Sequence, residues 1–232
     1  MPNLHNIFEF LDFTDNSEWD QVIDISLSKF TPSQADKYRH WMKVMVEHVL
    51  DTNMKFPDHS FQLKNISNSH KINELEFDFP VKESFDMTIL ESLFPEDDPR
   101  EIYTGQGEVK GMLTGFIDLF FEHDGKFYIL DWKSNFLGDK LEHYASEDLL
   151  FAMNQSNYHL QYMIYTLAVK KYLSSKLGNE FDYEKHFGGV IYLFLRGVRA
   201  DTDSGIYHFR PSKDQLDKME EIMKIENAKS PK

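Results

Sequence analysis

The sequence contains no cysteine in its 232 residues. Disulfide bonds, thiolate zinc sites and iron–sulfur clusters are therefore excluded, because each depends on cysteine sulfur. Any metal ion that this chain binds must be held by oxygen atoms and imidazole nitrogens. The sequence also lacks an apolar run near the roughly 20 residues that cross a bilayer, and its N-terminus has no basic-then-apolar signal. We therefore expect a cytoplasmic protein with no membrane partner.

Positive charge is scarce, because 25 lysines and arginines face 39 aspartates and glutamates, for a net charge of −14. Such a chain is a poor free-standing binder of nucleic acid, since phosphate binding draws on clustered lysine and arginine. A bound metal ion would change the field locally, because a cation dominates its surroundings. A chain of this charge would depend on a larger assembly to deliver a nucleic-acid substrate.

Several common activity motifs are also missing. The patterns GxxxxGK[ST], GxGxxG, HExxH and GxSxG do not occur. These absences argue against a nucleotide-driven motor, dinucleotide binding, a zinc protease and a serine hydrolase, because each motif supplies the groups that its chemistry needs.

What is present indicates a globular α/β protein, with 41% hydrophobic and 15% aromatic residues. This length suits one domain with a sizeable core. We expect a single domain over residues 1–232, with an N-terminal helical part over about 1–55, a catalytic core over about 70–210 and a C-terminal helix over about 212–226.

The apolar patterns predict a mixed sheet with helices on both sides. Residues 72–81 alternate between apolar and polar, which is typical of a half-buried strand, whereas the apolar run at 188–195 is typical of a strand buried on both faces. A long helix over about 156–177 separates that run from the preceding strand. A strand, a helix and a buried strand in this order predict a crossover with parallel pairing.

The predicted sheet centres on a hairpin over residues 111–138, GMLTGFIDLFFEHDGKFYILDWKSNFLG. The Asp-Gly pair at 124–125 is a strong hairpin signal, because both turn positions need a positive φ. If these two residues form the whole loop, counting back along both arms sets Asp118 directly opposite Asp131. A three-residue loop with a bulge would instead shift the register by one and put the two aspartates on opposite faces.

Three charged side chains therefore converge in an apolar setting. Asp131 and Lys133, two residues apart on one strand, point to the face that Asp118 shares. Two carboxylates forced together must share a proton, find a cation or bind a metal, and a divalent cation such as Mg²⁺ resolves the conflict most directly. The simpler alternative is a buried ion pair between Asp131 and Lys133 with Asp118 as a bystander.

Two carboxylates that hold a divalent ion beside a lysine suit phosphodiester hydrolysis. The metal lowers the pKa of a bound water and neutralises charge that develops on the phosphate. A lysine within reach of that water can orient it, help to deprotonate it and offset charge in the transition state.

Other polar residues have weaker signals. His5 begins a short amphipathic pattern, where a lone histidine is more often structural or exposed than a ligand. Glu74 and Asp78 lie on the polar side of the strand at 72–81, which indicates a solvated face. Gln161 and Tyr165, four apart on one helical stripe, present polar atoms side by side, and Gln161 is either a satisfied core group or a site residue.

The Asp118…Asp131-Trp132-Lys133 pattern resembles the PD-(D/E)xK nuclease superfamily, in which an Asp and then an acid-x-Lys across a hairpin bind the catalytic metal. The hairpin segment, together with YHLQYMIYTLAVKKYL and HFGGVIYLFLRGV, more narrowly resembles the C-terminal nuclease domain of RecB, from the RecBCD helicase–nuclease. The resemblance covers most of residues 4–210 and is most specific from Gly111 onward. It implies a restriction-endonuclease-like fold.

The resemblance also implies a site. Asp118, Asp131 and the backbone carbonyl of Trp132 would hold Mg²⁺. Mn²⁺ could replace Mg²⁺, and Ca²⁺ could occupy the same site. Lys133 would be catalytic. In this family the histidine of the segment matching LHNIFE is a metal ligand, so His5 would join them.

Three more residues take roles from the resemblance. Glu76, in ELEFDFPV, falls where the family keeps an active-site glutamate, so it would be catalytic. Gln161 and Tyr165 match a Q-x-x-x-Y helix that contacts DNA and supports the site.

By resemblance, the expected activity is a Mg²⁺-dependent deoxyribonuclease, exonuclease and endonuclease, that acts on single strands fed by a helicase in double-strand-break repair and recombination. The expected partners are DNA, a helicase region of the parent chain, RecC- and RecD-like subunits, and a RecA-like recombinase. Only four residues precede His5, as expected for a domain excised from a longer chain.

Two alternatives stay open. One is a protein-interaction module whose acidic surface docks a recombinase or regulator. The other is a solitary nuclease of the same superfamily with other nucleic-acid substrates, without an iron–sulfur cluster because cysteine is absent.

Overall fold

The structure, a computed structural model, describes residues 5–28, 30–105 and 107–223, without the side chains of His5 and Lys82. Its centre is a five-stranded sheet in the order β3-β4-β5-β6-β7. The strands are β3 (Lys71–Asp86), β4 (Glu108–His123), β5 (Lys126–Lys133), β6 (Phe187–Phe194) and β7 (Ile206–Phe209). The β5–β6 pair is parallel and the other pairs are antiparallel, which confirms the predicted mixed sheet.

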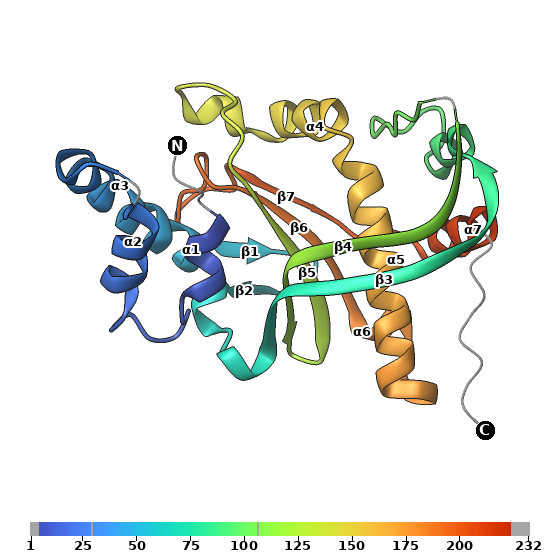
Figure 1. Cartoon of the computed structure of the whole chain (residues 1–232), viewed down its shortest axis with the longest axis horizontal. Coiled ribbons are helices and arrows are strands. Elements are labelled where there is room, and N and C mark those ends of the chain that lie inside the picture. Colours follow the sequence, from blue (N-terminus) through green and yellow to red (C-terminus); the bar gives the residue numbers. More distant parts are fainter. Residues whose placement is uncertain (1–4, 29, 106, 224–232) are drawn as a thin grey trace.

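Helices cover both faces of this sheet (Figure 1). They are α1 (His5–Phe10), α2 (Trp19–Leu27), α3 (Pro32–Asp51), α4 (Ser146–Gln155), α5 (Tyr158–Leu177), α6 (Tyr183–His186) and α7 (Lys213–Ile222). Alternate residues of the central strands explain the two layers. Phe120 and Ile129 pack in one apolar cluster with Leu167 of α5, whereas Phe121 and Leu130 belong to a second cluster with residues of α1–α3.

The hairpin between β4 and β5 has the predicted turn and register. Asp124 and Gly125 both have positive φ, 49° and 76°, as a two-residue loop requires. The strands pair from His123 opposite Lys126 to Leu119 opposite Leu130. The bulged alternative is therefore wrong, and the next position in this register sets Asp118 opposite Asp131.

The β3–β4 pair continues past β5 and crosses α5 (Figure 1). Side chains of β3 change faces near its start. The side-chain amide of Asn73 bonds to α1, whereas Leu75 packs against the cluster that contains α5. Between them Glu74 has φ 50°, which a residue with a side chain adopts at a cost. This reversal lies at the position opposite Asp118 on β4.

Some elements differ from the sequence predictions. A separate two-stranded sheet of β1 (Asn53–Lys55) and β2 (Ser60–Gln62) lies at the end of the expected N-terminal helical part and just after it. Short 3₁₀ segments occupy Leu63–Asn65, Asn68–His70, Met87–Leu93, Leu141–Tyr144 and Gly178–Glu180. Over the part of the chain that the structure describes, no helix combines the length and apolar character needed to span a membrane.

Candidate active site

Two carboxylates lie together where β4 parts from β5. Asp131, on the middle strand, is only 2% exposed. The half-buried Asp118 accepts a hydrogen bond through Oδ2 from the backbone N–H of Trp132 at 2.8 Å. Burial raises the pKa of Tyr165 above its ordinary value, and the charges of Asp131 and Asp118 raise it further. Both carboxylates therefore act on the same side of the sheet, toward α5.

Lys133 lies beside this pair of carboxylates. Its Nζ is 2.6 Å from Oδ1 of Asp131 and lies 3.7 Å from the centre of the Tyr158 ring. The ion pair expected by the simpler alternative is thus present. With both carboxylates ionised, however, Asp118, Asp131 and Lys133 carry one net negative charge. This net negative charge would attract an added cation.

Helix α5 supplies the polar residues that hold Lys133. Gln161 accepts through Oε1 from Nζ of Lys133 and from the hydroxyl of Tyr192, both at 3.0 Å. Its Nε2 donates to the hydroxyl of Tyr165 at 2.8 Å. Gln161 is therefore a satisfied, half-buried group and also a direct partner of the lysine.

Helix α1 is fixed against the strand that carries the site. The rings of Phe8 and Trp132 stack with centroids 4.3 Å apart and planes inclined by 20°. Asn73 and Lys71 donate to carbonyl groups near the end of α1, at 2.5 and 2.9 Å. The helix begins at His5, whose side chain lies outside the described structure, so its role as a metal ligand stays a prediction.

Two acids on β3, Glu74 and Glu76, lie across from the part of β4 that carries Asp118. Glu76 is exposed and pairs with Phe116, two positions from Asp118 along β4. Glu74 falls at the position opposite Asp118, and its charge contributes to the raised pKa of Tyr165. Glu74 is also exposed, as predicted for a solvated face. The catalytic role of Glu76 stays a prediction.

The donor set suits a hard divalent cation. Mg²⁺ prefers oxygen ligands and usually keeps several waters beside one or two carboxylates. Asp118 and Asp131 supply carboxylates, and Trp132 has a backbone carbonyl between Asp131 and Lys133. Among the described residues, no group of three or more acidic or histidine side chains is gathered for a metal. The other ligands would therefore come from the main chain, water, substrate or His5.

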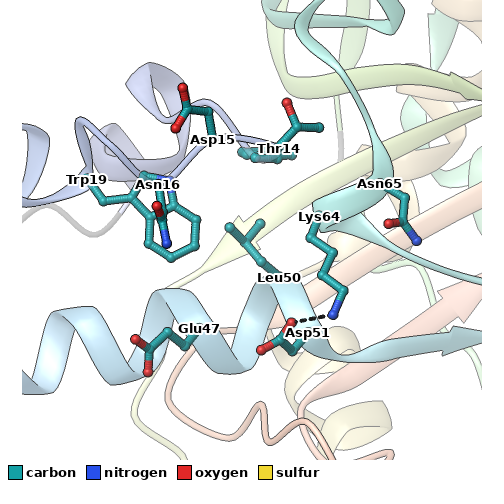
Figure 2. A pocket seen from close by; sticks show the side chains of 10 residues that line it. Thr14, Asp15, Asn16, Trp19, Glu47, Leu50, Asp51, Lys64 and Asn65 are labelled. Carbon is teal, nitrogen blue, oxygen red and sulfur yellow. Dashed lines mark hydrogen bonds and ion pairs between the residues drawn. The ribbon is translucent and has the colours of Figure 1, made fainter.

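A separate pocket lies at the end of α3 (Figure 2). It is lined by Trp19, Glu47, Asp51 and Lys64, among others, and an ion pair of 2.8 Å joins Lys64 to Asp51. None of the predicted site residues lines it. We assign it no part in the chemistry.

Comparison with known proteins identifies relatives of this chain. The chain is 36% identical over 233 residues to the RecBCD enzyme subunit RecB of Escherichia coli K12, covering 97% of this chain and 19% of that protein. The RecB subunit of Haemophilus influenzae is 33% identical over 221 residues, with 94% and 18% covered. That of Buchnera aphidicola (subsp. Acyrthosiphon pisum) is 39% identical over 177 residues, with 74% and 15% covered.

The chain thus spans about a fifth or less of the length of these relatives. The similarity to RecB that the motifs predicted is confirmed. The family model of the PD-(D/E)XK nuclease superfamily matches residues 15–229, and the mixed sheet flanked by helices is consistent with the restriction-endonuclease-like fold. This chain belongs to the PD-(D/E)XK nuclease superfamily.

Proposed function

We propose that this nuclease is a Mg²⁺-dependent deoxyribonuclease that hydrolyses phosphodiester bonds in single strands of DNA and leaves 5′-phosphate ends. The observation that carries the proposal is the cluster of Asp118, Asp131 and Lys133 on the face toward α5. Asp118, Asp131 and the carbonyl of Trp132 would hold the ion, with His5 as a further ligand. When bound, Mg²⁺ supplies an activated water and offsets charge on the phosphate.

The protein's own residues position the amine. Gln161 and the ring of Tyr158 hold the ammonium of Lys133 from the side of α5. These contacts do not depend on Asp131, so Lys133 stays in place when that carboxylate turns to a cation. An amine held there orients the attacking water and stabilises negative charge in the transition state.

We further propose that the chain works within a larger cytoplasmic assembly. Its net charge of −14 opposes spontaneous binding to DNA, so a helicase region would deliver the strand. The similarity to RecB supports a place beside RecC- and RecD-like subunits in double-strand-break repair and recombination, with a RecA-like recombinase as a further partner.

Cleavage assays test the activity. The chain is incubated with end-labelled single-stranded DNA, duplex DNA and RNA of one sequence, with Mg²⁺ or with EDTA. We expect Mg²⁺-dependent fragments from single-stranded DNA, and loss of cleavage in Asp131→Asn and Lys133→Ala. Asp15→Asn, in the pocket of Figure 2, is the matched control. Undiminished cleavage by Asp131→Asn would refute the proposal, and RNA as the better substrate would favour a solitary nuclease of another specificity.

A further inference from the structure

The segment after β5, residues 134–138, is tied down beside the candidate site. Nε of Arg196 donates to the carbonyl oxygen of Ser134 at 2.9 Å. The hydroxyl of Tyr158 donates to Oδ1 of Asn135 at 3.3 Å. The segment therefore leaves the strand with both of its first residues anchored.

The far side of the same segment is held equally well. The backbone N–H of Leu137 donates to the hydroxyl of Tyr144 at 3.2 Å. Gly138 lies so close to His143 that a Cβ there would be 1.8 Å from the imidazole Nδ1. A larger residue at 138 would therefore require the half-buried ring of His143 to move.

Between these anchors Phe136 is exposed over 60% of its surface. Single exposed apolar residues are common and need no explanation by themselves. This one differs because both of its neighbours are pinned and because it follows Lys133 by three residues. The Tyr158 side chain whose ring contacts Lys133 also bonds to Asn135, so the lysine and the segment share one support.

An exposed ring on an anchored segment, three residues after Lys133, suits an unpaired base. Bases stack on aromatic side chains whatever their sequence, and each such contact is worth about 1–3 kcal/mol. A ring on an anchored backbone loses less conformational freedom on binding than a ring on a free loop. A second exposed ring, Phe116, precedes Asp118 by two residues on β4. Each of the two strands that carry the site residues therefore has an exposed aromatic residue close to it in the sequence.

We propose that Phe136 is a stacking platform for an unpaired base of the strand that is cleaved. This inference rests on the proposed function and adds a contact that positions the substrate through a base rather than through phosphate. A duplex, whose bases are stacked on one another, would not use it.

The test combines protein variants with abasic substrates. Affinity for labelled single-stranded oligonucleotides is measured with Ca²⁺ in place of Mg²⁺, with abasic sites at successive positions. We expect one position at which loss of the base weakens binding to the intact protein by about 5- to 150-fold. Phe136→Ala should weaken binding of the intact strand by a similar factor, and the abasic site should then have no further effect.

Two further variants sharpen the result. Phe136→Trp should retain the affinity and the dependence on the base, because it keeps an aromatic face. Phe151→Ala removes an equally exposed ring, 65% exposed on α4, and should change neither. In cleavage assays with Mg²⁺, Phe136→Ala should raise KM and leave kcat within about twofold.

The outcomes separate this inference from the proposed function. Base-dependent binding that disappears in Phe136→Ala, without any cleavage by the intact protein, supports the platform and refutes the nuclease proposal. Cleavage with unchanged affinity in Phe136→Ala, or an abasic effect that persists in that variant, overturns the platform and leaves the nuclease proposal standing.

Discussion

The buried carboxylate of Asp131 depends on the charges around it. Its partner Lys133 is 7% exposed and 2.6 Å away. Removal of one member of a buried ion pair leaves the other charge uncompensated, which costs about 3–5 kcal/mol. A divalent cation bound by the same carboxylate would supply the missing charge and stabilise the fold.

We therefore expect Lys133→Met to lower the free energy of unfolding by about 3–5 kcal/mol in EDTA and by clearly less in Mg²⁺. Urea unfolding under the two conditions measures this. Lys43→Met, which breaks an exposed pair with Asp20, is the control and should cost less than about 1 kcal/mol. An equal loss in EDTA and in Mg²⁺ would speak against a cation at Asp131.

His159 gives a second prediction for a single residue. Burial lowers the pKa of His159 to about 4, and the charge of Arg100 lowers it further, whereas Asp98 opposes the shift. The unfolded chain, with a pKa near 6.5, binds the proton more readily than the folded chain does. The stability that His159 contributes is therefore complete above about pH 6.5 and is lost as the pH falls toward 4.

The free energy of unfolding should fall by up to about 1.4 kcal/mol per pH unit over that window from this residue alone. Urea unfolding at pH 7.5, 6.5, 5.5 and 4.5 measures the slope. His159→Gln should flatten it, and His40→Gln, at an exposed position, is the control. A slope that His159→Gln does not alter would show that other groups control the acid response.

For single residues, the sequence predicts that Asp118, Asp131 and Lys133 lie together, but it predicts the residues around them less completely. The turn fixes the register, so the convergence of Asp118 and Asp131 follows from counting. The proximity of Gln161 and Tyr165 follows from helical spacing. The position of Glu74 does not follow, because a local reversal of β3 decides it and simple alternation groups Glu74 with the other acids of the strand.

Among the elements, the β4–β5 hairpin carries the site, and its turn is the part most open to a simple test. Gly125 has φ 76°, and a Cβ added there would meet no atom within 4 Å, so only backbone strain opposes a larger residue. The left-handed conformation costs an ordinary residue about 1–2 kcal/mol.

Gly125→Ala should therefore lower the free energy of unfolding by about 1 kcal/mol and leave cleavage unchanged, because the register is set by many strand pairs. Thermal unfolding and the cleavage assay measure the two effects. Gly105→Ala is the control, since its Cβ also meets open space without a positive φ. If the Gly125→Ala protein is fully folded but does not cleave DNA, the turn must affect the site as well as join the two strands.

Elements with a strong local signal were predicted, and those that depend on distant contacts were not. The Asp-Gly turn and the apolar run of β6 follow from local sequence. So does the start of the C-terminal helix, where Ser212 and Gln215 bond reciprocally at 2.9 and 3.1 Å. The short strands β1 and β2 are three residues each. The hydroxyl of Tyr128 on β5 meets His59, just before β2, at 2.5 Å, and this tertiary contact leaves no local pattern.

For the whole molecule, the net charge of −14 sets the conditions under which DNA can bind. A divalent cation at the site would favour DNA, and DNA would favour the cation by the same factor, because linkage is reciprocal. We expect single-stranded DNA to bind about 5- to 150-fold more tightly with Ca²⁺ than with EDTA. Fluorescence anisotropy measures this, with Asp118→Asn as the variant that should lose the difference. An equal gain in that variant would assign the effect to general screening.

The central claim is that Asp118 and Asp131 together hold a divalent cation beside Lys133. Calorimetric titration of Mn²⁺ into the intact chain and into Asp118→Asn tests it most directly. The account predicts a saturable site in the intact chain that the substitution removes, while Asp15→Asn retains it. Equal binding by the intact chain and Asp118→Asn, or no saturable binding to the intact chain, would contradict the account.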